Sequence, residues 1–154
     1  MAFSAAPLQF GIAEPGLVYG DRPAAFGVAE SEGVVALVRI TKPGFAPWFD
    51  LPGGAIDPGE DAAQAVVREF GEETGLVIRT DAVLGRADQF LRNTEGLTFN
   101  NRSTLFRVAI EGRDPALKIE DDHELVWMTP LEAVRRLRHD SHAWAVASWL
   151  RQRP

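Results

Sequence analysis

The sequence predicts an α/β fold in which helices pack on a mixed β-sheet. Segments with the residue pattern of strands occur before, between and after segments with the pattern of helices, which favours a layered α/β arrangement. Hydrophobic residues make up 45% of the chain and charged residues 25%, as in ordinary globular proteins. The length of 154 residues is typical of one domain. We therefore expect a single domain over residues 1–154, in which residues 1–20 form an N-terminal arm.

Strands are expected where apolar residues alternate or run together between turn residues. Residues 25–29 and 34–40 predict a hairpin, because the intervening segment ESEG ends in a glycine suited to a positive φ. Residues 104–110 alternate with the two-residue period of a strand. The other expected strands are 48–51, 76–78, 82–90, 97–110 and 124–128.

The clearest helix is expected over residues 62–74. Asp61 is a suitable N-cap, Gln64 completes a capping box, and Gly75 is a natural C-terminal stop. An apolar stripe is predicted to face the sheet. Its members are Ala63, Val66, Val67 and Phe70.

Two more helices are expected near the C-terminus. Thr129 precedes Pro130 at a first helical position, and this helix should run to about Arg138. Ser141 is the expected cap of a last helix, which carries Trp144 and further apolar residues.

Composition excludes several classes of protein. The chain has 16 basic and 22 acidic residues and a net charge of −6, which argues against binding a nucleic-acid polymer. It has no cysteine, so disulfides, thiol nucleophiles and cysteine-ligated metals are excluded, and its three histidines form no HExxH zinc motif. The longest apolar run, residues 34–38, is far shorter than the roughly 20 residues of a membrane span. We expect no membrane segment or signal peptide, and a cytoplasmic location.

Three acidic residues share one face of the helix expected over 62–74. Glu69, Glu72 and Glu73 are spaced i, i+3 and i+4, where like charges repel, and two of them lie near the negative end of the helix dipole. A divalent cation would explain this arrangement, and oxygen ligands alone favour Mg²⁺ or Mn²⁺. The alternative is a solvated acidic helix face.

The residues before this helix decide between the two interpretations. The glycines in LPGGAIDPGE (residues 51–60) allow the backbone to approach a metal or a phosphate closely. From Gly54 to Leu76 the sequence reads GAIDPGEDAAQAVVREFGEETGL. This closely resembles the Nudix box, G-x5-E-x7-R-E-U-x-E-E-x-G-U with U apolar, and every fixed position matches.

The resemblance implies the Nudix fold, an α/β/α sandwich around a central mixed β-sheet. It also implies a hydrolase that cleaves a nucleoside diphosphate linked to another moiety, using Mg²⁺ or Mn²⁺. Such a cation would neutralise charge on the diphosphate and lower the pKa of the attacking water.

Residue roles follow from the same resemblance. The implied metal ligands are Glu69, Glu72, Glu73 and the main-chain carbonyl of Gly53. Glu60 is implied to approach this cluster, and Arg68 to hold its carboxylates in orientation. The general base is left open between Glu69 and the acidic loop over residues 120–124, which is otherwise a polar turn.

Substrate contacts are less specific. Arg39 and Phe90 are candidates for binding the substrate, with the backbone of Gly54 close to a phosphate. Other basic and aromatic residues are candidates too, although each is as readily explained as a surface or core residue. They are Lys42, Arg86, Arg102 and Arg107, and Phe49, Phe99 and Trp127; we expect Phe49 and Trp127 to pack in the core.

The expected partner is a small nucleotide. The proline and tyrosine that mark ADP-ribose pyrophosphatases and dinucleoside polyphosphate hydrolases are absent after the box, where the chain reads LRNT (residues 91–94). This leaves the MutT-like group, whose substrates include nucleoside triphosphates. The alternative is a non-catalytic nucleotide- or metal-binding module. An isopentenyl diphosphate isomerase would need a cysteine, and RNA decapping is disfavoured by the acidic charge. Monomer and homodimer are both left open.

Overall fold

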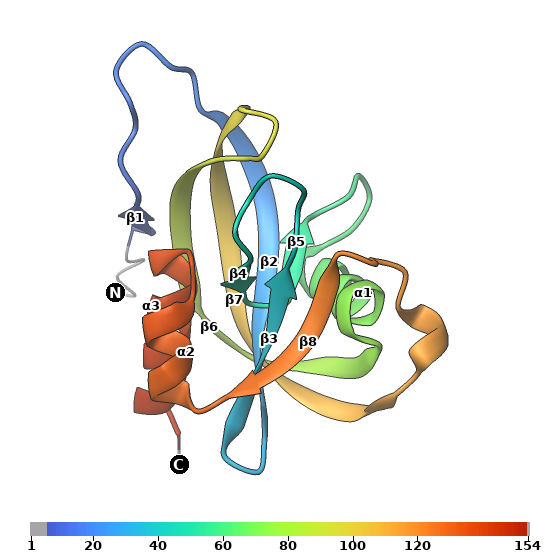
Figure 1. The fold of residues 1–154 in the computed structure, drawn as a ribbon. Helices are drawn as coiled ribbons and strands as arrows, with labels where there is room; N and C mark the ends of the chain where they lie inside the picture. The colour runs from blue at the N-terminus through green and yellow to red at the C-terminus, as the bar shows by residue number, and fades with distance from the viewer. Residues whose placement is uncertain (1–5, 154) are drawn as a thin grey trace.

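The computed structural model describes residues 6–153, and its centre is a mixed β-sheet (Figure 1). Among the described residues, eight strands join in the order β1-β6-β7-β2-β3-β4, with β5 paired to β2 and β8 paired to β3. The strands are β1 (Leu8–Phe10), β2 (Gly20–Ser31), β3 (Val34–Ile40), β4 (Trp48–Asp50), β5 (Gly53–Ala55), β6 (Leu76–Arg92), β7 (Thr98–Arg113) and β8 (His123–Met128). The pairs β1–β6 and β2–β7 are parallel and the others are antiparallel.

Helices cover the sheet from two sides, as the α/β/α prediction requires (Figure 1). They are α1 (Ala62–Thr74), α2 (Pro130–Arg136) and α3 (Asp140–Arg151), and a 3-10 turn spans Pro115–Leu117. Side chains of strand β2 pack on both faces of the sheet. Phe26 and Val28 belong to the cluster under α2 and α3, whereas Ala25 and Ala29 belong to the cluster under α1. The predicted fold class is confirmed.

Helix α1 begins and ends where its capping residues predict. Asp61 Oδ1 accepts the Gln64 N–H at 2.8 Å, and Gln64 Oε1 accepts the Asp61 N–H at 2.9 Å. Gly75 ends the helix at a positive φ of 76°. The predicted stripe is only partly correct, because Val66 is buried but Val67 is 39% exposed.

The buried face of α1 is rotated from the predicted stripe. Val66, Phe70 and Glu73 are all buried, so the face that meets the sheet includes a carboxylate. Phe70 fits there because a Cβ on Gly27 of β2 would lie 2.9 Å from the Phe70 ring. The glutamates predicted as metal ligands therefore divide between the interior and the open edge of the helix.

Strands β1 and β6 differ from the prediction. Residues 76–78 and 82–90 belong to one strand, β6. Its pairing with β7 continues through the residues between them because the register shifts at three points. Within the predicted arm, residues 8–10 form β1 and pair with β6; residues 1–5 lie outside the described residues. Because this parallel pairing joins segments that lie far apart in the sequence, no pattern of neighbouring residues predicts it.

Two predictions near the C-terminus are wrong. Helix α3 has His139 as its N-cap, and the Ser141 N–H is taken by Gln89 Oε1 at 3.1 Å, so Ser141 lies inside the helix and does not cap it. Trp127 is 38% exposed and lies outside the core, whereas Phe49 packs against the core as expected.

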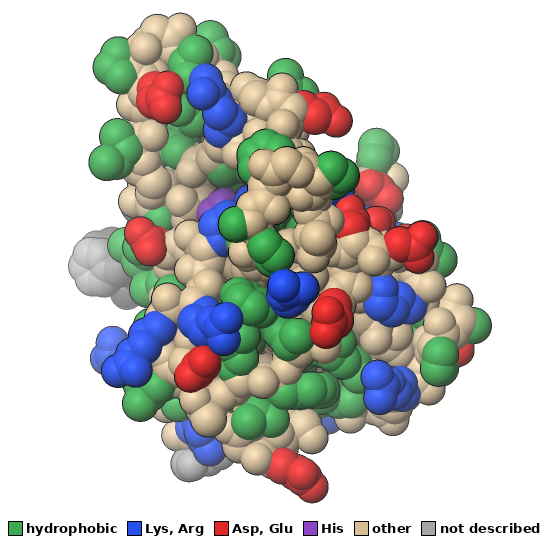
Figure 2. All heavy atoms as spheres, viewed as in Figure 1, with side chains coloured by type: hydrophobic (Ala, Val, Ile, Leu, Met, Phe, Trp, Pro, Cys, Tyr) green, Lys and Arg blue, Asp and Glu red, His purple; other side chains and the backbone are tan. Residues whose placement is uncertain are grey.

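The surface carries mixed charge. In Figure 2, basic and acidic side chains are interspersed over the face shown, without one large patch of a single sign. Over the part of the chain that the structure describes, no helix is long and apolar enough to cross a membrane.

Candidate active site

Two glycines let the backbone of β5 approach its neighbours closely, β2 at Gly53 and α1 at Gly54. Gly53 has a φ of 146°, and a Cβ there would lie 2.2 Å from the Ala25 carbonyl oxygen, so only glycine fits. A Cβ on Gly54 would lie 2.9 Å from the carboxylate of Glu69. The missing side chain lets the Glu69 carboxylate rest directly on the backbone of β5.

Arg68 joins four carboxylates at the open edge of α1, those of Glu60, Glu69, Glu72 and, at 3.4 Å, Asp57. Its Nε lies 2.7 Å from Glu60 Oε2, and its Nη1 lies 3.0 Å from Glu69 Oε1 and 3.1 Å from Glu72 Oε2. Its Nη2 donates to the Ala55 carbonyl at 3.1 Å, which fixes the guanidinium relative to β5. Arg68 therefore holds these carboxylates together.

The carboxylates around Arg68 differ in their electrostatics. Hydrogen bonds from Arg68 lower the pKa of Glu60 to about 2. Burial raises the pKa of Glu69; Arg68 opposes this, and the nearby charges of Glu72 and Glu120 add to it. Glu69 is thus a partly desolvated carboxylate among like charges, an arrangement that a bound cation would stabilise.

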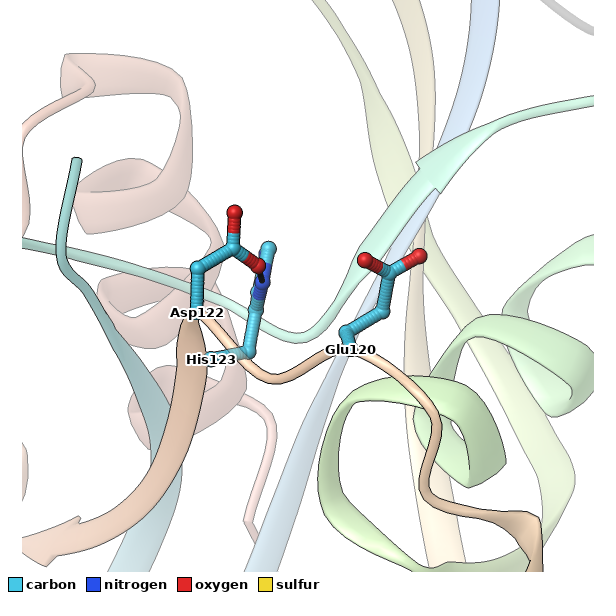
Figure 3. Close-up of side chains that lie close together, drawn as sticks. All are labelled: Glu120, Asp122 and His123. Carbon is cyan, nitrogen blue, oxygen red and sulfur yellow. Dashed lines mark hydrogen bonds and ion pairs between the residues drawn. The ribbon is translucent and has the colours of Figure 1, made fainter. Parts of the chain in front are cut away.

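The loop between the 3-10 turn and β8 brings further polar groups to the helix. The N–H groups of Ile119 and Glu120 donate to the Glu72 carbonyl at 2.9 and 3.0 Å, which anchors the loop on the last turn of α1. Glu120, Asp122 and His123 each offer a ligand atom, and these atoms lie within 4.8 Å of one another. Figure 3 shows Asp122 and His123 side by side, with Glu120 at the other end of the loop.

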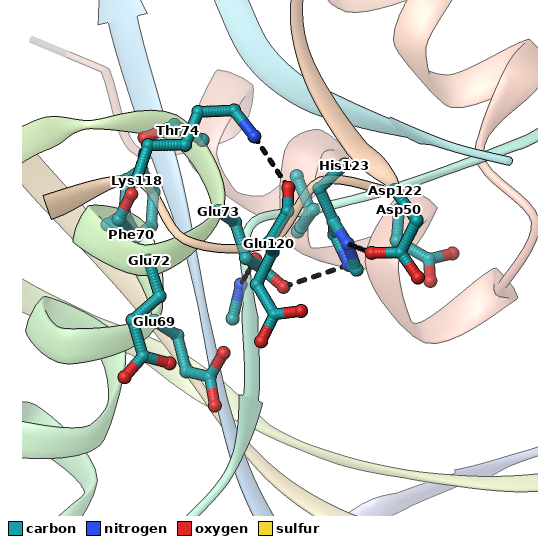
Figure 4. Close-up of polar contacts among 12 residues, drawn as sticks. Asp50, Glu69, Phe70, Glu72, Glu73, Thr74, Lys118, Glu120, Asp122 and His123 are labelled. Atoms are coloured by element: carbon teal, nitrogen blue, oxygen red, sulfur yellow. Dashed lines mark hydrogen bonds and ion pairs between the residues drawn. The ribbon is translucent and has the colours of Figure 1, made fainter. Parts of the chain in front are cut away.

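Glu73 is held apart from the Arg68 cluster. Its Oε1 accepts the Gly53 N–H at 2.9 Å, and its Oε2 lies 3.2 Å from His123 Nε2 (Figure 4). Burial raises the pKa of Glu73. Burial acts to lower the pKa of His123, but the neighbouring carboxylates of Glu73 and Asp122 outweigh it and raise that pKa.

Part of α1 and of the loop before β8 lines a cleft of about 290 Å³. Glu69, Glu73, Glu120 and His123 form its acidic side. The rest of its polar lining comes from β2, β4, β7 and the link between α2 and α3, and consists of Arg22, Asp50, Asn101, Arg138 and His139.

Arg138 is fixed at the wall of the cleft. Its guanidinium pairs with Asp50 Oδ2 at 2.8 Å and lies 4.6 Å from the centroid of the Trp48 ring. Its backbone N–H donates to the Phe49 carbonyl at 2.9 Å. Arg22 is held more loosely, at 3.4 Å from Asn101 Oδ1.

The structure separates the predicted site residues into two groups. Glu69 and Glu73 line the cleft together with Gly53 and Gly54. Glu60 and Glu72 lie beside them, joined to Glu69 through Arg68, whereas Arg39 and Phe90 belong to neither set.

Arg39 and Phe90, the two side chains predicted to bind the substrate, lie outside the cleft. Val38 and Ile40 line the cleft, so Arg39 between them faces the other side of β3. Leu91 lines it too, whereas the Phe90 ring packs 5.0 Å from Tyr19, centroid to centroid.

Most of the other basic candidates have partners elsewhere. Lys42 pairs with Asp122, Arg102 with Asp21 and Asp88, and Arg107 with Asp81. Arg86 is exposed. Arg22, Arg138 and His139 were not predicted, because they come from separate elements and form no local motif with the box.

A family model described as the NUDIX domain matches residues 20–150. The chain belongs to the NUDIX family. The match covers the cleft-lining strands and both helical layers, so membership rests on far more than the box.

Curated relatives match over part of their length. An ADP-ribose pyrophosphatase of Methanocaldococcus jannaschii is 39% identical over 59 residues, which is 38% of this chain and 35% of that protein. A protein of Bacillus subtilis, named as a candidate 8-oxo-dGTP diphosphatase, is 32% identical over 93 residues, 60% of this chain and 58% of its own length. The chain therefore spans between about one third and three fifths of these relatives.

Solved structures share the fold. A NUDIX hydrolase from Nitrosomonas europaea superposes with a TM-score of 0.71 at 21% identity, covering 85% of this chain and 89% of that one. A MutT protein from Methanosarcina mazei superposes with a TM-score of 0.68 at 20% identity, covering 89% and 98%.

Proposed function

We propose that this Nudix protein is a metal-dependent pyrophosphohydrolase of a small nucleotide. It cleaves the diphosphate bond of a nucleoside diphosphate linked to another moiety. The observation that carries this proposal is the Glu69 carboxylate, which rests on the Gly54 backbone at the cleft and is partly desolvated beside Glu72 and Glu120. Figure 4 shows these three carboxylates pointing to the same side of the loop and helix.

The donor set suits a hard divalent cation. Glu69, Glu72 and Glu73 supply carboxylate oxygens and Gly53 a carbonyl oxygen, the kind of ligand that Mg²⁺ and Mn²⁺ prefer. In the proposal, Glu69, Glu72, Glu73 and the Gly53 carbonyl hold the metal. Such a cation supplies charge neutralisation on the diphosphate and a lower pKa for the attacking water.

The chain's own residues orient the reactants. Arg68 holds the Glu69 and Glu72 carboxylates at 3.0 and 3.1 Å, so they stay in place when the substrate arrives. A general base must lie at the cleft to take a proton from the attacking water. Glu69 and Glu120 both line the cleft, and both remain candidates for this role.

Two arginines across the cleft are proposed to contact the substrate in place of Arg39. Arg22 and Arg138 both line the cleft, and the guanidinium of each can pair with a phosphate oxygen. Arg138 is the better ordered of the two, since Asp50 and Trp48 hold it.

The substrate class is proposed as a nucleoside triphosphate or a related nucleotide. The relatives named above carry two different substrate names, ADP-ribose and 8-oxo-dGTP, so both belong in any test. A cytoplasmic location and a monomeric or homodimeric state are further predictions.

The test is a substrate panel with Mg²⁺ or Mn²⁺, in which both products are identified by mass. It includes ordinary and oxidised nucleoside triphosphates, ADP-ribose, NADH, nucleotide sugars and dinucleoside polyphosphates. We expect turnover by the wild type, its loss in Glu72→Gln and Glu73→Gln, and its retention in the control Glu111→Gln on the exposed end of β7. Metal binding without turnover of any substrate would instead favour a non-catalytic binding module.

A further inference from the structure

We propose that His123 is a positioning residue that fixes the carboxylate of Glu73 for metal binding. The inference rests on the proposed function, because it gives Glu73 the role of a metal ligand. It concerns a contact outside the box, between α1 and the start of β8 (Figure 4).

Glu73 needs a polar partner that Arg68 does not provide. Arg68 contacts Glu60, Glu69 and Glu72 at the open edge of α1, whereas Glu73 turns inward and is only 5% exposed. A buried carboxylate is costly unless it is paired and hydrogen-bonded. His123 is the side chain that reaches it, at 3.2 Å.

The two oxygens of Glu73 are held from different elements. The Gly53 N–H of β5 donates to Oε1 at 2.9 Å, and His123 Nε2 of β8 lies 3.2 Å from Oε2. Two contacts on two oxygens define the plane of the carboxylate as well as its position. Each oxygen keeps a second lone pair for a cation.

The second ring nitrogen of His123, Nδ1, also lies against a carboxylate. Its Nδ1 lies 2.7 Å from Asp122 Oδ1, so both ring nitrogens face carboxylate oxygens. Neither nitrogen is then free to coordinate a metal. The cluster of Glu120, Asp122 and His123 is therefore better explained as support for Glu73 than as a separate metal site.

The contacts that hold Asp122, and through it His123, extend to the loop between β3 and β4. Asp122 pairs with Lys42 through its side chain, and its carbonyl accepts the Thr41 N–H at 3.0 Å. His123 also lies opposite Ile40 in the register of β3 and β8. The imidazole is thus fixed by sheet pairing on one side and by Asp122 on the other.

The test compares Mn²⁺ affinity, measured by electron paramagnetic resonance without substrate, in the wild type and two variants. His123→Leu removes both hydrogen bonds and should weaken Mn²⁺ binding by about 10- to 100-fold, the range typical of lost outer partners of metal ligands. His123→Gln keeps a donor near Glu73 and should recover most of the affinity. Glu111→Gln is the control and should bind as the wild type does.

Asp122→Asn provides a second route if His123→Leu does not fold. It should weaken Mn²⁺ binding in the same direction but less, because His123 stays and asparagine still offers it an oxygen acceptor, without the negative charge of Asp122. Circular dichroism checks that each variant is folded. In turnover, the Mg²⁺ concentration for half-maximal activity should rise in His123→Leu, while KM for the nucleotide at saturating Mg²⁺ should stay near the wild-type value.

The outcomes separate this inference from the proposed function. Wild-type Mn²⁺ affinity in folded His123→Leu or, where that variant does not fold, in Asp122→Asn would overturn the inference. So would an affinity loss that His123→Gln fails to recover. A wild type that binds Mn²⁺ and hydrolyses nothing would overturn the proposed function, while the affinities would still decide the role of His123.

Discussion

Acid should destabilise the protein through His142, a fully buried residue of α3. Its Nδ1 accepts the Leu51 N–H at 3.1 Å, and its ring lies 4.3 Å from that of Phe26, centroid to centroid. Protonation would remove this acceptor and place a charge in the core. Burial accordingly lowers the pKa of His142 to about 3.

The expected loss of stability follows from proton linkage. An unfolded histidine has a pKa of about 6.5, so as the pH falls the unfolded chain binds this proton before the folded protein does. The contribution of His142 to stability is complete above about pH 6.5 and is lost progressively as the pH falls toward about 3. At pH 5 the free energy of unfolding should already be lower by about 2 kcal/mol from this residue.

The assay is urea denaturation of the wild type and His142→Asn at several pH values between 7.5 and 5. Asparagine offers an oxygen acceptor for Leu51 but does not titrate in this range. The wild type should lose about 2 kcal/mol more than the variant between these limits. His139, whose pKa burial lowers to about 4, is present in both proteins and cancels in the comparison. Parallel pH profiles for the two proteins would refute the reasoning.

Three further substitutions probe the packing and the cleft. Gly27→Ala puts a Cβ 2.9 Å from the Phe70 ring and should lower the free energy of unfolding by about 1–3 kcal/mol in chemical denaturation. Gly54→Ala should displace the Glu69 carboxylate, 2.9 Å from the new Cβ, and reduce metal-dependent kcat; unchanged kcat would contradict the packing of that carboxylate on β5. Arg138→Gln should raise KM about 10-fold or more with a smaller effect on kcat, since a charge-assisted hydrogen bond is worth about 1.5–3 kcal/mol; an unchanged KM would remove this arginine from the substrate site.

Local signals predicted much of the fold. Helix α1 was located from its capping box and terminal glycine, which act within a few residues of the helix ends. The hairpin of β2 and β3 was similarly located from its turn. The pairing of β1 with β6 and the start of α3 depend on contacts such as Ser141 with Gln89, which no local pattern reveals.

The candidate site was likewise predicted where it depends on a contiguous motif and missed where it depends on tertiary contacts. The carboxylates around Arg68 lie on one helix and the loop before it, so a single contiguous motif predicted their meeting. Arg39 was expected at the cleft, but side chains alternate along β3 and Arg39 lies on the face away from the cleft. A strand assigned without its register does not show which of its residues face the cleft. Arg138 reaches the cleft through tertiary contacts, and its proximity to the box is visible only in the folded chain. The loop over residues 120–124, which contains His123, was expected near the box only through the family resemblance.

The most direct test of the central claim is nucleotide hydrolysis by the wild type and Glu69→Gln, with Mg²⁺ and with the metal chelated. We predict that the wild type releases two phosphate-bearing products from at least one nucleotide, that chelation abolishes this, and that Glu69→Gln loses most of the activity while remaining folded. Hydrolysis that persists without metal, or that is unchanged in Glu69→Gln, would contradict a metal-dependent reaction at these carboxylates.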